Sequence, residues 1–238
     1  MPSAHSKNLE IHNAAMFKES VGEGEANLYL TIGQTYAWPN ESDPTAPTTS
    51  DKDIIGIYKN MLGGKRITGN DVRHCVPRFD WTPNQQWNQY EDYWDDTVLK
   101  SPNTRFYVVT DDFNVYKCLS NNYGGLSTVK PTSTITDKTF QTSDKYIWKY
   151  LYSISAEDQL KFTTADFIPV KTLSIADGST QWVVQSTAVD GSINNIRVTA
   201  PGQNYTLNGT VIITGDGSGA NAFALKSATG TISEIVVD

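Results

Sequence analysis

The chain has 238 residues, of which 38% are hydrophobic and 19% are charged, a composition that indicates a globular protein and excludes a disordered one. Its formal net charge is −7 and its Lys and Arg residues are scattered, which argues against binding to nucleic acid. No apolar run approaches the roughly 18 residues of a membrane span, and the first residues contain no stretch of the signal-peptide type. Because two cysteines cannot form a disulfide framework, we expect a soluble protein made in a reducing cytoplasm, with Cys75 and Cys118 as buried thiols.

The N-terminal part of the chain is predicted to contain a helix, a strand and a loop. Residues 8–21 have the loose apolar periodicity of an amphipathic helix, and residues 26–32 alternate like a strand. Residues 38–47 include three prolines, which exclude regular structure there.

A second helix is predicted after this loop. Ser50 can cap it, with an acidic residue three positions later as in a capping box. Its apolar residues fall at i, i+3, i+4 and i+7 and predict one stripe facing a core: Ile54, Ile57, Tyr58 and Met61. The glycines at residues 63–64 are expected to end the helix.

The central part of the chain, residues 71–154, is predicted to consist mainly of strands. Residues 71–81 start like a strand that breaks at Pro77, and residues 106–109 and 115–119 predict a hairpin. Residues 146–154 alternate bulky aromatic with polar side chains, as a half-buried strand does.

A polar segment, residues 120–145, separates the last two of these strands and is too polar to bury a face of its own. We expect it on the surface, free to meet a neighbour. Residues 156–160 predict a short helix, and residues 166–170 close this region.

The composition changes near residue 173, where charge becomes sparse and an internal repeat begins. Residues 191–198 recur as residues 230–237, and strands are predicted at 210–214 and 220–225. One such unit cannot bury its apolar face alone. Because the sequence stops inside the second copy, we expect it to be the front part of a longer gene product.

A glycine-rich loop at residues 215–219 is the motif that most resembles a phosphate-binding loop. Such loops need a helix after them, whereas the residues that follow here alternate like a strand, so a tight turn is predicted. Metal sites are not expected, because His74 and Cys75 are neighbours that a strand points to opposite faces. No Cys/His pair predicts a nucleophile either, and no cofactor is expected.

The aromatic and acidic residues of the stretch 87–96 allow two interpretations. The aromatic faces could hold sugar rings beside paired carboxylates, as in a carbohydrate-binding or carbohydrate-cleaving protein. Core packing or a protein–protein contact is the favoured interpretation, since Trp and Tyr are enriched at interfaces. The candidate interface residues are Trp38, Trp87, Tyr90, Tyr93 and Trp94.

Several segments together resemble the baseplate wedge protein made by the eighth gene of T4-like contractile-tailed phages. Their order and spacing match over roughly residues 14 to 172, and the most specific pieces are the residues of 77–81 and the Ile-Trp-Lys-Tyr-Leu run. The segments are Leu28–Gly33 with Trp38 and Pro39, residues 54–62, Val76–Trp81, Val115–Leu119, Tyr146–Ile154 and Asp166–Val170. The glycine-rich repeat is absent from the short family members, and the family's C-terminal portion is missing here.

The resemblance implies a mainly β (α+β) fold, a β-sandwich with short helices on its loops, over residues 1–172. Residues 173–238 would then be a separate glycine-rich β-repeat module. It also implies a structural, non-enzymatic role in the virion tail baseplate, assembled in the host cytoplasm. The implied partners are other wedge subunits and a second copy in a homodimer, with no nucleic acid and no membrane. No catalytic residue, metal or cofactor comes with the family.

Overall fold

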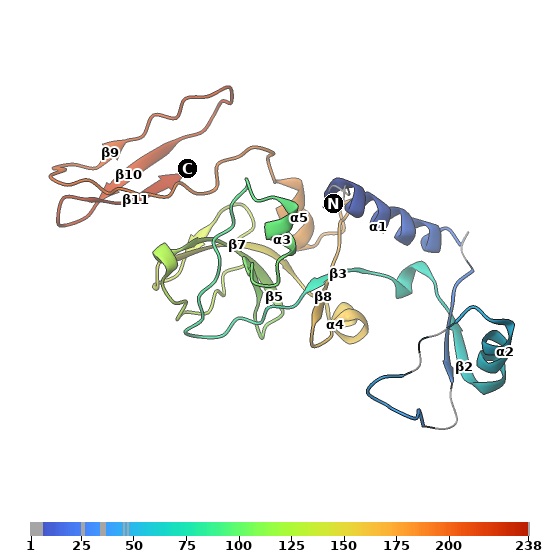
Figure 1. Cartoon of the computed structure of the whole chain (residues 1–238). Helices are drawn as coiled ribbons and strands as arrows, with labels where there is room; N and C mark the ends of the chain where they lie inside the picture. The colour runs from blue at the N-terminus through green and yellow to red at the C-terminus, as the bar shows by residue number, and fades with distance from the viewer. Residues whose placement is uncertain (1–6, 25–26, 34–36, 45, 47, 238) are drawn as a thin grey trace. The chain divides into compact units, whose positions relative to one another are not determined.

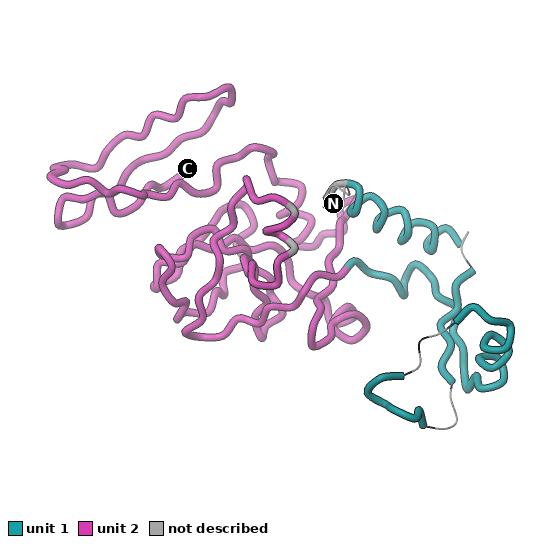
Figure 2. The backbone as a smooth tube through the Cα atoms, viewed as in Figure 1, with its two compact units in different colours: residues 1–74 teal, residues 75–238 magenta. Residues whose placement is uncertain are grey.

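The computed structural model describes residues 7–24, 27–33, 37–44, 46 and 48–237 (Figure 1). Most of its elements are strands in open sheets, with few and mostly short helices, so the mainly β class is confirmed. The chain forms two compact units, residues 1–74 and residues 75–238 (Figure 2). The boundary predicted near residue 173 lies inside the second unit and stays a prediction.

The first unit is built on a two-stranded antiparallel sheet of β1 and β2, in which Tyr29 pairs with Arg66. The helix predicted over residues 8–21 is confirmed as α1. The strand predicted over residues 26–32 is confirmed in part, since β1 begins at Tyr29 and residue 26 lies outside the described residues. The elements of this unit are α1 (Lys7–Gly22), β1 (Tyr29–Gly33), α2 (Asp51–Asn60), β2 (Met61–Arg66) and the 3-10 turn η1 (Gly69–Asp71).

Helix α2 begins where it was predicted, because the Ser50 hydroxyl accepts a hydrogen bond from the backbone N–H of Asp53 at 3.3 Å. It ends early: Met61 already belongs to β2, and the glycines at residues 63–64 lie inside that strand instead of stopping the helix. The chain leaves the helix because this segment pairs with β1, and glycine is a poor helix former. The backbone of β1 lies very close to the end of α2, since a Cβ on Gly33 would lie 2.4 Å from the carbonyl oxygen of Asn60.

The apolar stripe of α2 does not face a core, which corrects the prediction made for it. Ile54, Ile57 and Tyr58 are exposed, and the helix buries none of its residues. The physical reason is the small size of the sheet beside it, because two strands offer little surface against which a helix can be buried.

The second unit contains a four-stranded sheet with the order β4-β5-β7-β6. The predicted hairpin is confirmed as β4 and β5, and the predicted aromatic strand is β7, which pairs antiparallel with β5. The two aromatic strands are therefore direct neighbours despite the segment between them. The strands are β4 (Tyr107–Val109), β5 (Asn114–Asn121), β6 (Phe140–Gln141) and β7 (Tyr146–Ser153).

Both faces of this sheet carry buried side chains, as the alternation of β-strand residues requires. One cluster consists of Trp87, Val108, Tyr116, Cys118, Tyr146, Trp148 and Tyr150. A second cluster, Val109, Val115, Ile154 and Ile168, includes a residue of β8 (Phe167–Val170), which pairs with β3 (His74–Pro77). Strand β3 matches the strand-like start predicted for residues 71–81, whereas no strand was predicted for residues 166–170, where β8 lies. The closure of the sheets into a sandwich stays a prediction. Helices α3 (Asp96–Lys100) and α4 (Ala156–Phe162) lie on loops, and α4 confirms the helix predicted at 156–160.

The segment of residues 120–145 is held more firmly than its polarity predicted. Ser127 and Pro131 are fully buried, and the indole N–H of Trp81 donates a hydrogen bond to the Ser127 hydroxyl at 3.0 Å. The expectation of a segment lying free on the surface is therefore wrong for this part of it. The hydrogen bond from Trp81 allows Ser127 to be buried, because a polar side chain with a hydrogen-bond partner can lie in a core.

The two cysteines differ in their surroundings. Cys118 lies in the aromatic core, as expected, but Cys75 is exposed, so the prediction of two buried thiols is wrong for Cys75. The reason is the alternation of β3, in which His74 and Val76 are half-buried while Cys75 points outward.

The residues after 173 include a helix, α5 (Thr180–Ser186), in a region where only strands were predicted. The Ser179 hydroxyl caps it by accepting a hydrogen bond from the Trp182 N–H at 3.1 Å. Val184 packs against the aromatic core, and the Thr180 hydroxyl lies 3.0 Å from that of Tyr150. Packing against β7 thus stabilises a helix that its own sequence does not predict.

The C-terminal sheet has the order β11-β10-β9, with β9 (Gly209–Thr210), β10 (Ala222–Lys226) and β11 (Ile232–Val237). The strand predicted at 210–214 is observed only as the two residues of β9. The loop at 215–219 is followed by the strand β10 and not by a helix, which fits the predicted turn. The two repeat copies differ, because residues 230–237 supply β11 while residues 191–198 contribute one isolated bridge, Ile196 to Ile235. These two residues occupy equivalent positions in the repeat. The repeat module as such stays a prediction.

Candidate functional site

Trp87 is a core residue and not a surface residue. Its side chain is 2% exposed, its backbone N–H donates to the Tyr146 hydroxyl at 3.3 Å, and its carbonyl accepts from the Asn121 side chain at 3.0 Å. An indole buried in this way can neither contact a partner nor stack on a sugar. Core packing, one of the two favoured interpretations of the stretch 87–96, therefore applies to Trp87.

The rings of Tyr90 and Trp94 belong to a half-buried aromatic cluster. The Tyr90 ring lies 5.2 Å from that of Phe106 and 6.0 Å from that of Trp94, and the Lys117 ammonium lies 4.5 Å from the Tyr90 centroid. Tyr93, by contrast, is 78% exposed. Within this stretch the structure leaves Tyr93 as the aromatic side chain most open to a partner.

Trp38 belongs to the first unit, whereas the other four candidate interface residues belong to the second. Its side chain is partly exposed, and its backbone N–H donates to the Glu41 carboxylate at 2.8 Å in a tight turn. Exposure leaves Trp38 available for contact with another molecule.

The first unit exposes nine large apolar side chains on and beside β1, α2 and the start of β2, here together called the apolar surface. Successive residues of β1 point to opposite faces of the sheet, so these side chains do not all share one face. Its most exposed member, Tyr58, has 71% of its surface open to solvent. Exposed apolar side chains gathered on a few elements mark interaction sites in soluble proteins. The sequence showed the stripe on α2, but its period cannot distinguish burial inside the chain from burial against a partner. The members are Leu28, Tyr29, Leu30, Ile32, Ile54, Ile55, Ile57, Tyr58 and Leu62.

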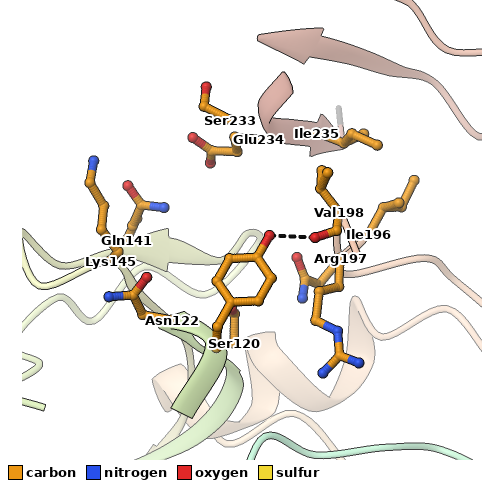
Figure 3. Close-up of a pocket in the computed structure, with 12 residues that line it drawn as sticks. Ser120, Asn122, Gln141, Lys145, Ile196, Arg197, Val198, Ser233, Glu234 and Ile235 are labelled. Atoms are coloured by element: carbon orange, nitrogen blue, oxygen red, sulfur yellow. Dashed lines mark hydrogen bonds between the residues drawn. The ribbon is translucent and has the colours of Figure 1, made fainter. Parts of the chain in front are cut away.

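The second unit contains a cavity of about 210 Å³, here called the Tyr123 pocket, which the sequence did not indicate. Segments far apart in the chain line it: Asn122 and Tyr123 after β5, Gln141 of β6, Lys145 in the following turn, and Glu234 of β11. Figure 3 shows Gln141 and Lys145 on one side of it and the residues of β11 on another.

Hydrogen bonds hold the walls of the Tyr123 pocket together. The Tyr123 hydroxyl donates to the carbonyl oxygen of Val198, drawn as a dashed line in Figure 3. The Asn195 side chain donates to the carbonyl oxygen of Leu119 at 2.9 Å. These two bonds attach the segment before β9 to the end of β5, so they fix the width of the pocket.

Three residues that line the pocket have left-handed backbone conformations although none is glycine: Asn122 (φ 48°), Tyr123 (φ 57°) and Lys145 (φ 69°). Such a conformation costs an L-residue about 1–2 kcal/mol. The Gly124 N–H donates to the Asn121 side chain at 3.0 Å, and the Lys145 N–H donates to the Thr142 carbonyl at 2.9 Å. These hydrogen bonds stabilise the strained turns, and backbone strain of this kind is concentrated at functional sites.

Asp144 anchors the turn beside the pocket. Its carboxylate accepts hydrogen bonds from the backbone N–H groups of Thr128 at 2.7 Å and Val129 at 2.9 Å, and from the Thr142 hydroxyl. Burial acts to raise the pKa of the Asp144 carboxyl, but the hydrogen bonds from Thr142, Val129 and Thr128 outweigh it, and the pKa lies below its ordinary value. The carboxylate thus links two parts of the segment of residues 120–145, the turn before β7 and the backbone at Thr128 and Val129.

The described residues offer neither a metal site nor a membrane-spanning helix. No group of three or more His, Cys, Asp or Glu residues within this part of the chain could hold a metal ion. No helix among the same residues is long and apolar enough to cross a membrane.

The sequence is similar to a phage baseplate wedge protein. The relative is "Baseplate wedge protein gp8" of Enterobacteria phage T4, which is 22% identical over 192 residues. The match covers 65% of this chain and 56% of that protein, so the chain spans little more than half of its relative's length. No protein-family model matches the sequence.

The similarity agrees in kind with the resemblance that the motifs indicated. It supports a relationship to a structural phage tail protein. At this level of identity, the contact residues of the two proteins have to be argued from this chain's own surface.

Proposed function

We propose that this chain is a structural subunit of a phage tail baseplate wedge that acts by protein–protein assembly. In this proposal it is assembled in the host cytoplasm and resides in the baseplate of a contractile tail. Its partners are other wedge subunits and a second copy of itself. The similarity to a named wedge protein supports this role, since that protein is a virion component by its name.

The apolar surface of the first unit is the observation that carries the proposal. Burying one large apolar side chain contributes about 1.5–3 kcal/mol, and this surface presents nine of them to solvent. A two-stranded sheet is marginal by itself, so the first unit gains stability from any protein that covers it. A subunit that acts by assembly needs this kind of surface.

The finer architecture belongs to the same proposal. Residues 1–172 would form the wedge-like β-sandwich portion, completed by a layer over the open sheets, and residues 173–238 would form the added repeat module. Trp38 in the first unit, and Tyr90, Tyr93 and Trp94 in the second, would each contribute aromatic contacts to partner subunits, since aromatic side chains are enriched at interfaces.

Co-expression with the other tail proteins of the same phage tests the proposal. The double variant Ile57→Ser/Tyr58→Ser removes two apolar side chains from α2 without touching a buried residue. We expect co-purification of the partner to fall at least about tenfold, as for an interface hot spot, with the thermal midpoint of the chain unchanged.

The matched control is Leu160→Ser, because Leu160 is 90% exposed on α4 of the second unit and lies outside the apolar surface. This variant should assemble like the wild type. If the double variant also assembles like the wild type, the apolar surface is not the interface and the proposal loses its main support.

A further inference from the structure

We propose that the Tyr123 pocket binds one uncharged sugar ring, a hexopyranose. The inference is independent of the baseplate role, because it rests on the lining of this pocket alone. It also places sugar recognition away from the stretch 87–96, where the burial of Trp87 removes a stacking face.

The first argument is the aromatic ring at the centre of the lining. Tyr123 is 66% exposed although it is a large aromatic residue, so its ring has area available for contact. Its hydroxyl is already bonded to the Val198 carbonyl, and its backbone is locked in a left-handed turn. The ring is therefore held still, and a fixed aromatic face is what the apolar C–H face of a pyranose packs against.

The second argument is the hydrogen-bonding capacity around that ring. The side chains of Gln141, Lys145 and Glu234 line the pocket, and none of them has a hydrogen bond or ion pair to another described residue. The Lys145 ammonium can only donate, the Glu234 carboxylate can only accept, and the Gln141 amide does both. A polyhydroxylated ring needs donors and acceptors together, since each of its hydroxyls is both.

Charge and size select the class of sugar. Lys145 and Glu234 carry opposite charges, and Figure 3 shows the Arg197 guanidinium pointing away from them, so the groups facing the pocket sum to no net charge. An uncharged ring is therefore preferred over an acidic one. The volume of about 210 Å³ is below the roughly 300–1,000 Å³ of sites for drug-sized ligands, which limits the occupant to a single ring.

Ligand-detected NMR with the full 238-residue chain tests this inference. The probes are the methyl pyranosides of glucose, galactose and mannose, with methyl glucuronide as the acidic comparison. We expect saturable binding of at least one neutral glycoside with a Kd of about 1 mM, and weaker binding of the glucuronide. Tyr123→Phe keeps the aromatic face but loses the hydroxyl bond to Val198 that holds the ring, so it should weaken binding by about threefold. Tyr123→Leu and Glu234→Gln should each weaken it about tenfold.

The control variant is Tyr93→Leu, which removes an exposed tyrosine from the stretch 87–96 and should leave binding unchanged. If Tyr123→Leu lowers the thermal midpoint, its loss of binding could reflect unfolding, and Glu234→Gln alone then tests the inference. The Glu234 carboxylate has no hydrogen bond or ion pair to another described residue, so this variant should leave the fold intact. The inference is overturned if no neutral glycoside binds saturably, if Glu234→Gln leaves binding intact, or if methyl glucuronide binds more tightly. Loss of binding in Tyr93→Leu would assign the sugar to the stretch 87–96 instead.

Discussion

Lys117 of β5 and Lys149 of β7 are direct cross-strand partners in the four-stranded sheet. The Lys117 ammonium lies 4.5 Å from the centroid of the Tyr90 ring, and the Lys149 ammonium donates to the Thr136 carbonyl at 3.1 Å. No ion pair joins either ammonium to a carboxylate among the residues that the structure describes. Like charges in this position destabilise a sheet, so the pair is a local weakness beside the aromatic core.

Replacing one of these lysines should therefore stabilise the protein. We expect Lys149→Gln to raise the free energy of unfolding at neutral pH by about 0.2–1 kcal/mol, and Lys149→Glu to raise it further by creating an opposite-charge pair. Denaturant unfolding followed by tryptophan fluorescence measures the change. Lys138→Gln, at an exposed position of the preceding segment, should have no effect. A loss of stability in both Lys149 variants would contradict the expectation.

The same pair predicts a pH dependence. Burial lowers the pKa of Lys117, with a further contribution from Lys149, and burial also lowers the pKa of Lys149. Both lysines then lose their protons in the folded state at a lower pH than in the unfolded state, where the pKa of lysine has its ordinary value of 10.5. The free energy of unfolding attributable to the pair should rise as pH increases through the folded-state pKa values toward 10.5. This rise should be smaller in Lys149→Gln, as unfolding curves at stepped alkaline pH can measure.

The burial of Trp87 and the exposure of Tyr93 predict opposite results for two nearby substitutions. Trp87→Ala should destabilise the protein by about 3–5 kcal/mol, because it leaves a cavity in the aromatic core. Tyr93→Ala should change the free energy of unfolding by no more than about 0.5 kcal/mol, as is usual at the surface. Thermal and denaturant unfolding of both variants provide the test, and equal effects would refute the placement of Trp87 in the core.

Asp144 should be a stability determinant with an acid limit. Asp144→Ala leaves the N–H groups of Thr128 and Val129 without their acceptor, which should cost about 1–3 kcal/mol. Because the pKa of Asp144 is lowered in the folded state, its stabilising contribution is present above the unfolded-state pKa and is lost as pH falls through the folded-state value.

Unfolding measured from neutral to acid pH checks the prediction for Asp144. The difference between wild type and Asp144→Asn should shrink toward low pH. A difference that stays constant across this range would show that the charge of the carboxylate is not what matters.

Lys145 offers a test of the strained turn between β6 and β7. The Lys145 N–H donates to the Thr142 carbonyl at 2.9 Å with Lys145 itself at φ 69°, a position that suits glycine better. Lys145→Gly should stabilise the protein by about 0.5–1 kcal/mol, the relief of strain minus the added freedom of the unfolded chain. Lys145→Ala, which keeps the strain and removes the charge, is the control and should show no such gain in denaturant unfolding.

The sequence by itself determined the elements whose causes are local. Alternation located β5 and β7, and the hydroxyl of Ser50 located the start of α2, because side-chain period and capping chemistry operate within a few residues. The order of these segments in the sequence also indicates the relationship to a baseplate wedge protein.

Only the tertiary structure decided which of these surfaces are covered. The stripe of α2 and the indole of Trp87 are both apolar in the sequence. The stripe is exposed to solvent whereas Trp87 is only 2% exposed, because burial depends on which other segments pack against each of them. Helix α5 exists because the aromatic core gives it a face to pack on. The Tyr123 pocket joins residues more than one hundred positions apart, a proximity that no local pattern contains.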